Sequence, residues 1–157
     1  METSCNQNVL TNISEIQISY QPEFKASERP MITTSVEIYE VIKGHWNTDT
    51  IALKEEFKIL LLNRNNRVLG LSHIGIGGMH GVYVDPKLIF ATALKSWAAS
   101  IALIHNHPSG GLKPSPEDIN FTHRLVDGGK LLGILIIDHL IITPDNRYYS
   151  FADEGLI

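Results

Sequence analysis

Residues 105–118, HNHPSGGLKPSPED, contain the side chains of the chain best suited to chemistry. His105 and His107 follow an apolar run that is typical of a central strand, and two positions apart they project to the same face. Ser115 is suited to cap a helix whose first turn contains Asp118. A glycine pair between the histidines and Ser115 lets the chain reverse. We therefore expect Asp118 to point back toward the two imidazoles.

Two imidazoles and one carboxylate can bind Zn²⁺ and leave its fourth tetrahedral position open to water, as in catalytic zinc sites. Zinc lowers the pKa of such a water to about 7. A hydrolytic site also needs an oxyanion partner, which the Ser115 hydroxyl can supply, and a base. The acidic pair Glu55-Glu56 begins a predicted strand and offers that base, but neighbours in a strand face opposite sides and the spacing does not choose between them. The competing interpretation of residues 105–118 is structural, a strand followed by a turn and a well-capped helix.

The composition indicates one globular domain. The 157 residues are 43% hydrophobic and 19% charged, with a net charge of −4, and these values argue against a nucleic-acid partner. The single cysteine, Cys5, excludes an intrachain disulfide and a multi-thiolate zinc site. Without an apolar run long enough to cross a membrane and without a signal peptide, the sequence predicts a cytoplasmic protein.

The pattern of apolar residues predicts an α/β domain with a mixed central sheet. We expect an N-terminal arm over residues 1–28, with an edge strand in SEIQISY (14–20), followed by the domain over 29–157. Trp46 and Trp97 lie on apolar helical faces and are predicted to be core. The expected helices cover 35–44, 86–100 (largely buried) and 115–126 (ended by Gly128-Gly129), and the expected strands are a hairpin within 55–75 and single strands at 81–84, 100–105, 131–143 and 148–151.

Together, His105, His107, Ser115 and Asp118 spell H-x-H-x7-S-x2-D, which resembles the JAMM (MPN+) motif of JAB-domain metalloproteases. The segments HNHPSG, PSPED and DHLII resemble the RadC-like branch of that family. The resemblance covers roughly residues 29–157. It implies a cytidine-deaminase-like α/β/α fold and a mononuclear zinc site with His105, His107 and Asp118 as ligands.

The resemblance also implies catalytic roles. Ser115 would stabilise the oxyanion, and Glu55, two positions before the strand residue Phe57, would be the general acid/base, with Glu56 as the alternative. Family members outside the RadC-like branch cleave peptide or isopeptide bonds, so the expected activity is zinc-dependent hydrolysis of an amide bond in a peptide or protein substrate. We expect the chain to lack the upstream helical domain of full-length RadC proteins.

Other functions remain open at this stage. The domain could be a non-catalytic, zinc-containing interaction or DNA-repair-associated module, or a metal-dependent nuclease. His139 beside Asp138 could orient a metal ligand or be a buried histidine satisfied within the sheet. Pairing between exposed sheet edges could form a homodimer.

Overall fold

The computed structural model of the protein describes residues 14, 19–21, 23–78 and 81–157. It contains one five-stranded sheet with the strand order β2-β1-β3-β4-β5. The elements are a short 3₁₀ helix η1 (Ala26–Glu28), the helices α1 (Ser35–Lys43), α2 (Pro86–Lys95) and α3 (Pro116–Leu132), and the strands β1 (Glu56–Leu62), β2 (Val68–Ile76), β3 (Ser100–Asn106), β4 (Leu135–Ile142) and β5 (Tyr148–Ser150).

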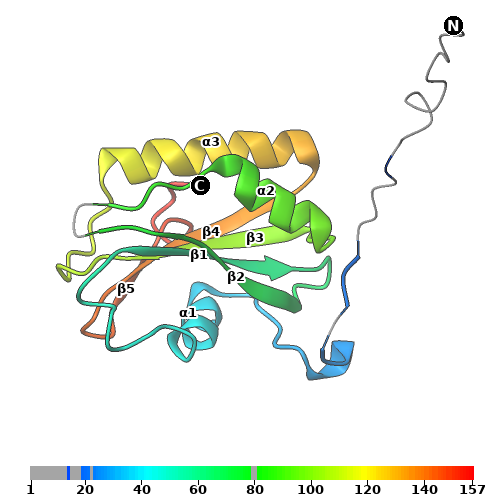
Figure 1. Cartoon of the computed structure of the whole chain (residues 1–157), viewed down its shortest axis with the longest axis horizontal. Coiled ribbons are helices and arrows are strands. Elements are labelled where there is room, and N and C mark those ends of the chain that lie inside the picture. Colours follow the sequence, from blue (N-terminus) through cyan, green and yellow to red (C-terminus); the bar gives the residue numbers. More distant parts are fainter. Residues whose placement is uncertain (1–13, 15–18, 22, 79–80) are drawn as a thin grey trace, which may run out of the picture.

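The sheet lies between two layers of helix. Helix α1 covers one face, and α2 and α3 cover the other (Figure 1). The pair β3–β4 is parallel, whereas β1–β2, β1–β3 and β4–β5 are antiparallel. This arrangement confirms the predicted α/β/α fold with a mixed sheet. Within the described ranges, no helix has the length and apolar character that crossing a membrane requires.

Strand alternation divides the core into two clusters. In β3, Ile101 and Leu103 face α2 and α3, while Ala102 and Ile104 face α1. All seven residues of β3 are buried, which explains why this strand reads as a continuous apolar run. Because β3 is central and its neighbours hold it on both sides, its carboxyl end is a rigid position for functional side chains.

Helix α1 and the hairpin confirm the sequence predictions. Thr34 caps α1, and its hydroxyl oxygen accepts a hydrogen bond from the backbone N–H of Glu37. In the β1–β2 hairpin, Asn66 has a φ of 54°, which asparagine tolerates better than most residues. The predicted strand within 14–20 falls largely outside the described residues.

Helix α2 differs from its prediction. It ends at Lys95, only Ile89 and Ala93 are buried along it, and Leu88 and Leu94 are about half exposed. Trp97 follows with a φ of 56° and is 81% exposed, so its predicted core position is wrong. The left-handed turn at Trp97 directs the chain into β3 and points the indole outward.

Two further predictions are corrected. Residues 82–84 are not a strand, and Gly81 makes only an isolated bridge with Gly78. Helix α3 passes through Gly128-Gly129 and ends at Leu132, and it is capped by Gly133, which has a φ of 68°. Gly129 serves close packing and not termination, because a Cβ there would overlap the carbonyl oxygen of Ile134.

Replacing Gly129 with alanine should therefore destabilise the domain, although alanine is the better helix former. The added methyl group has to displace backbone, and such overpacking typically costs about 1–3 kcal/mol of unfolding free energy. Urea denaturation measures this change. Gly44→Ala is the matched control: Gly44 has right-handed helical angles and no atom within 4 Å of the place that the alanine Cβ would take, so its effect should stay within about 0.5 kcal/mol. Equal stability of Gly129→Ala and wild type would contradict the packing argument.

Candidate metal centre

The two histidines lie at the carboxyl end of β3. His105 is 1% exposed, and its Nε2 lies 3.0 Å from Nε2 of His107, which directly follows the strand. The backbone N–H of His107 donates to the carbonyl oxygen of Ile142, so this position is tied to β4. The structure thus brings both imidazoles to one face, as their spacing predicts.

Asp118 approaches the histidines from the start of α3. Its Oδ1 lies 3.4 Å from Nε2 of His105, and its Oδ2 lies 3.7 Å from Nε2 of His107. The hydroxyl and the backbone N–H of Ser115 each donate to Oδ2 of Asp118 at 2.7 Å, while the N–H of Asp118 donates to the Ser115 oxygen at 3.1 Å. This capping box holds the carboxylate and leaves Oδ1 directed at His105.

The donor atoms of His105, His107 and Asp118 fit a metal ion. Each residue offers one ligand atom, and these atoms lie within 4.8 Å of one another. A tetrahedral ion with ligands at 2.0–2.2 Å has neighbouring ligand atoms about 3.3–3.6 Å apart. The two imidazole nitrogens are 3.0 Å apart, and the nearest contacts to Asp118 are 3.4 Å from His105 to Oδ1 and 3.7 Å from His107 to Oδ2, so small side-chain rotations bring three ligand atoms to this spacing. The three residues could therefore hold a metal ion without rearrangement of the backbone.

The tautomer of His107 supports the same conclusion. Its Nδ1 lies 2.7 Å from the carbonyl oxygen of Gly111, which can only accept, so Nδ1 carries a hydrogen. In the neutral ring Nε2 then has a free lone pair. A backbone carbonyl is a common partner for the second ring nitrogen of a metal-binding histidine.

The tautomer of His105 is set by a buried chain of hydrogen bonds through His139 and Thr122. The Thr122 hydroxyl donates to the carbonyl oxygen of Asp118 at 2.6 Å, so its oxygen accepts from Nδ1–H of His139, also at 2.6 Å. Nε2 of the neutral His139 ring in turn accepts from Nδ1–H of His105 at 2.7 Å. The lone pairs of His105 and His107 therefore converge at Nε2, an arrangement that a cation stabilises.

Asp138 does not take part in this chain. It accepts hydrogen bonds from the Ser150 hydroxyl and from the backbone N–H groups of Ala152 and His139. Its carboxylate thus organises the turn after β5, while His139 alone contacts the ligand His105. The sequence suggested Asp138 and His139 as a pair, and the structure separates their contacts. Thr122, which completes the chain, had no sequence signal beyond its position one helical turn after Asp118.

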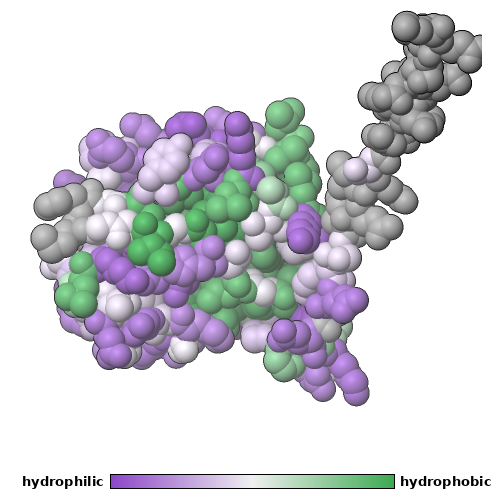
Figure 2. All heavy atoms as spheres, in the orientation of Figure 1, coloured by the Kyte–Doolittle hydropathy of each residue, from purple (hydrophilic) through white to green (hydrophobic). Residues whose placement is uncertain are grey.

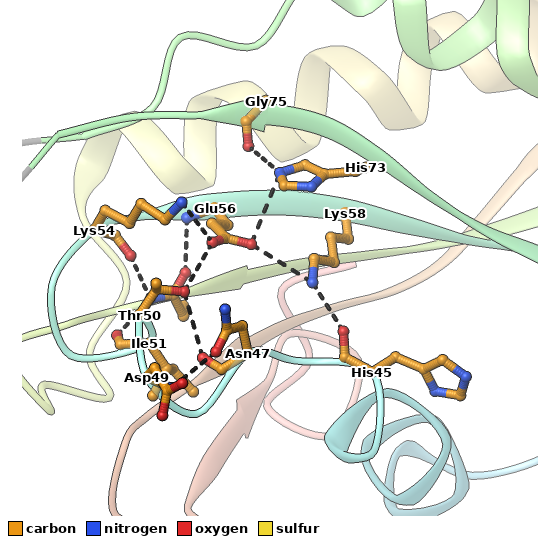
Figure 3. A network of polar contacts seen from close by, with 11 residues as sticks. His45, Asn47, Asp49, Thr50, Ile51, Lys54, Glu56, Lys58, His73 and Gly75 are labelled. Carbon is orange, nitrogen blue, oxygen red and sulfur yellow. Dashed lines mark hydrogen bonds and ion pairs between the residues drawn. The ribbon is translucent and has the colours of Figure 1, made fainter.

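The structure separates Glu55 and Glu56 as strand alternation requires. Half-buried Glu55 lines the same cavity as His105 and Asp118. Glu56 faces the other side of the sheet, is 4% exposed, and forms ion pairs with Lys54 at 3.3 Å and Lys58 at 3.5 Å (Figure 3). Of the two acids, Glu55 is the one that the fold places beside the candidate metal centre.

Asn106 positions the backbone on which Glu55 lies. It is fully buried, its Oδ1 accepts from the N–H of Glu56 at 2.7 Å, and its Nδ2 donates to the carbonyl oxygens of Ile51 and Lys54 at 2.7 and 2.9 Å. The sequence analysis missed this role. Strand alternation could have indicated it. Because His105 and His107 point to one face, Asn106 between them has to point to the other face of the sheet.

The environment shifts the pKa values of the site. Burial lowers the pKa of His105 to about 4 and that of His139 well below its usual range, which keeps both rings neutral. Burial raises the pKa of Asp118, but the adjacent His107 and the hydrogen bonds from the hydroxyl and the backbone N–H of Ser115 outweigh it and hold this pKa well below the ordinary value. The adjacent Asp118 carboxylate raises the pKa of His107 because it favours the protonated ring. For Glu55, burial raises the pKa, partly opposed by His107.

A cavity of about 420 Å³ opens beside His105 and Asp118. Its lining comes from the start of β1, from β3, from α3 and from the segment between β2 and α2, and consists of Glu55, Phe57, Val82, Tyr83, Val84, Pro86, His105, Glu117, Asp118, Asn120, Phe121 and Arg124. On the face of the molecule in Figure 2, hydrophobic residues lie below the polar outer surface of α3. The cavity is large enough to admit part of a peptide-sized ligand next to the candidate centre.

Fold and site together define an α/β/α domain with a His-His-Asp cluster at the end of its central strand. The model of the RadC-like JAB domain family matches residues 32–156, and the chain belongs to this family. The JAMM resemblance noted from the sequence is thus confirmed at the level of the family.

Several curated relatives share the domain. A UPF0758 protein of Alkaliphilus metalliredigens is 46% identical over 104 residues, which are 66% of this chain and 44% of the relative. A UPF0758 protein of Methanosarcina mazei is 47% identical over 104 residues, 66% of this chain and 45% of the relative. One from Porphyromonas gingivalis is 38% identical over 136 residues, 87% of this chain and 59% of the relative. The chain thus spans about half the length of these relatives.

The hydrogen-bond chain through Thr122 predicts an effect on metal affinity. Thr122→Val keeps the shape of the side chain but leaves the buried Nδ1–H of His139 without an acceptor. Loss of such a supporting contact should weaken Zn²⁺ binding by about 10–100-fold, as measured by competition with a chromophoric chelator. Thr122→Ser retains the hydroxyl and should bind Zn²⁺ within a few-fold of wild type. Wild-type affinity in a folded Thr122→Val protein would refute the proposed control of the His105 tautomer.

Proposed function

We propose that this domain is a zinc-dependent hydrolase that cleaves an amide bond in a peptide or protein substrate. The observation that carries the proposal is the convergence of the free Nε2 lone pairs of His105 and His107 with a carboxylate oxygen of Asp118. Two imidazoles and one carboxylate match the ligand set of catalytic zinc sites. Membership in the JAB family supports the same class of chemistry, since family members outside the RadC-like branch cleave peptide or isopeptide bonds.

The three ligands would hold Zn²⁺, which supplies Lewis-acid polarisation and lowers the pKa of water. Glu55 would take a proton from water and later deliver it to the leaving amine. Burial suits it to both steps, because its raised pKa brings the carboxyl group closer to neutral pH. Phe57 and Phe121 line the same cavity and limit the access of bulk water to it.

Ser115 has two proposed roles, which use the same hydroxyl group at different steps. In the structure its hydroxyl donates to Oδ2 of Asp118 at 2.7 Å, and this bond orients the carboxylate. To stabilise a developing oxyanion, the hydroxyl has to rotate from Asp118 toward the substrate. Ser115 is therefore proposed to position Asp118 in the resting site and to donate to the oxyanion during turnover.

Two substitutions separate metal binding from chemistry. Glu55→Gln should leave one zinc per chain and lower turnover by at least about 100-fold, because an amide cannot take the proton. His107→Ala should lose both the zinc and the activity. Elemental analysis of protein purified without an affinity tag gives the metal content, and a panel of peptide and isopeptide substrates gives the turnover.

Glu56→Gln is the control for Glu55→Gln, because it makes the same chemical change on the opposite face of β1. It should retain both zinc and turnover unless the loss of its ion pairs unfolds the protein, which circular dichroism detects. Undiminished turnover of Glu55→Gln would exclude the mechanism. Stoichiometric zinc with no hydrolysis of any amide or of plasmid DNA by the wild type would favour a non-catalytic module.

A further inference from the structure

The cavity beside the candidate metal centre has a strongly uneven distribution of charge. Glu55, Glu117 and Asp118 line the end at the centre, whereas Arg124 lines the same cavity further along α3. Arg124 follows Asp118 by six residues, so it lies about 9 Å along the helix axis at a rise of 1.5 Å per residue. An elongated ligand in this cavity thus meets carboxylates at one end and a guanidinium at the other.

Arg124 is exposed on the surface of α3. Arg29, Arg67 and Arg147 each donate to a carbonyl or carboxylate oxygen of the protein. For Arg124, the described part of the chain provides neither an ion pair nor a hydrogen-bond acceptor. A guanidinium group binds a carboxylate through two parallel hydrogen bonds, which makes it a specific receptor for such a group.

The cavity between the metal centre and Arg124 is lined by apolar side chains together with the uncharged Asn120 and Tyr83. Phe121 on α3 lies three positions before Arg124 and therefore shares its side of the helix. Val82 and Val84, on the segment between β2 and α2, also line the cavity. A ligand that spans the cavity thus needs an uncharged, partly apolar middle portion.

We propose that Arg124 is a specificity-determining residue that binds a carboxylate of the substrate, separated from the scissile amide by roughly the spacing of Asp118 and Arg124 along α3, about 9 Å. This distance corresponds to two or three extended residues. The inference rests on the proposed function and refines it: the substrate is a peptide with an apolar residue near the cleaved bond and a carboxylate two or three residues away. The carboxylate is either a free C-terminus or an acidic side chain.

Calorimetric binding to the zinc-loaded full chain tests the proposal without relying on turnover. Acetohydroxamate probes the metal alone. Suberic acid monohydroxamate adds a hydrocarbon chain that ends in a carboxylate, and its terminal amide is the uncharged match. The acid should bind wild type about tenfold more tightly than the amide, the value expected for one hydrogen-bonded charge pair.

Arg124→Gln should abolish this preference and leave acetohydroxamate binding unchanged. Arg64→Gln, which removes an equal charge from the β1–β2 turn outside the cavity, should retain the preference. An acid-to-amide ratio near one in wild type, or an unchanged ratio in Arg124→Gln, would overturn the inference alone. Failure of the wild-type chain to take up zinc would overturn the metal centre, and this subsite with it.

Two peptide probes then distinguish the sources of the carboxylate. Both have a hydroxamate followed by two residues; one ends in a free carboxylate, and the other ends in an amide and has Asp as its second residue. Tighter binding of the first identifies a C-terminal carboxylate, and tighter binding of the second identifies an acidic side chain. If neither loses affinity in Arg124→Gln, no carboxylate of a peptide binds at Arg124.

Discussion

The alternation of side chains at the carboxyl end of β3 is the constraint on which the rest of the site depends. Successive residues of an extended strand point to opposite faces, so His105 and His107 meet on the α3 side while Asn106 points toward the α1 side. Asn106 then binds the loop that leads into β1, and this loop carries Glu55. Three consecutive residues thus position two candidate metal ligands and, indirectly, the candidate base.

Burial makes this arrangement demanding, because each polar group removed from water needs a partner. The interior of the site meets this demand with neutral groups: His105, His139 and Thr122 form one chain of hydrogen bonds that ends on a backbone carbonyl. The charged carboxylate of Asp118 remains at the half-buried rim, where it faces His107. The uncharged interior therefore supports a ligand, and the rim supplies the charge that a metal ion needs.

Much of the fold and of the metal cluster could be predicted from the sequence, since both depend on local rules. A continuous apolar run identified β3, and the spacing of its last residues brought His105 and His107 together. The capping pattern placed Asp118 at the start of α3. The end of that helix was predicted too early, because Gly129 lies within the helix and makes room for the backbone of Ile134, where the chain turns back after Gly133. The predicted core position of Trp97 was wrong because the helix ends before this residue. The left-handed turn at Trp97 then points the indole away from the face that helical periodicity predicts.

Local sequence rules cannot decide whether Glu55 or Glu56 faces the histidines, because this depends on how β1 packs in the sheet. Alternation establishes that the two acids face opposite sides, but only the position of β1 in the sheet decides which side holds the histidines. Phe57 pairs with His105 across the antiparallel β1–β3 ladder, so residues with the parity of Phe57 share the face of His105. Glu55 has this parity and Glu56 does not. The register between β1 and β3, which the hydrophobic pattern of both strands sets, therefore distinguishes the two acids. It places Glu55 beside the cavity and Glu56 in a buried ion-pair network.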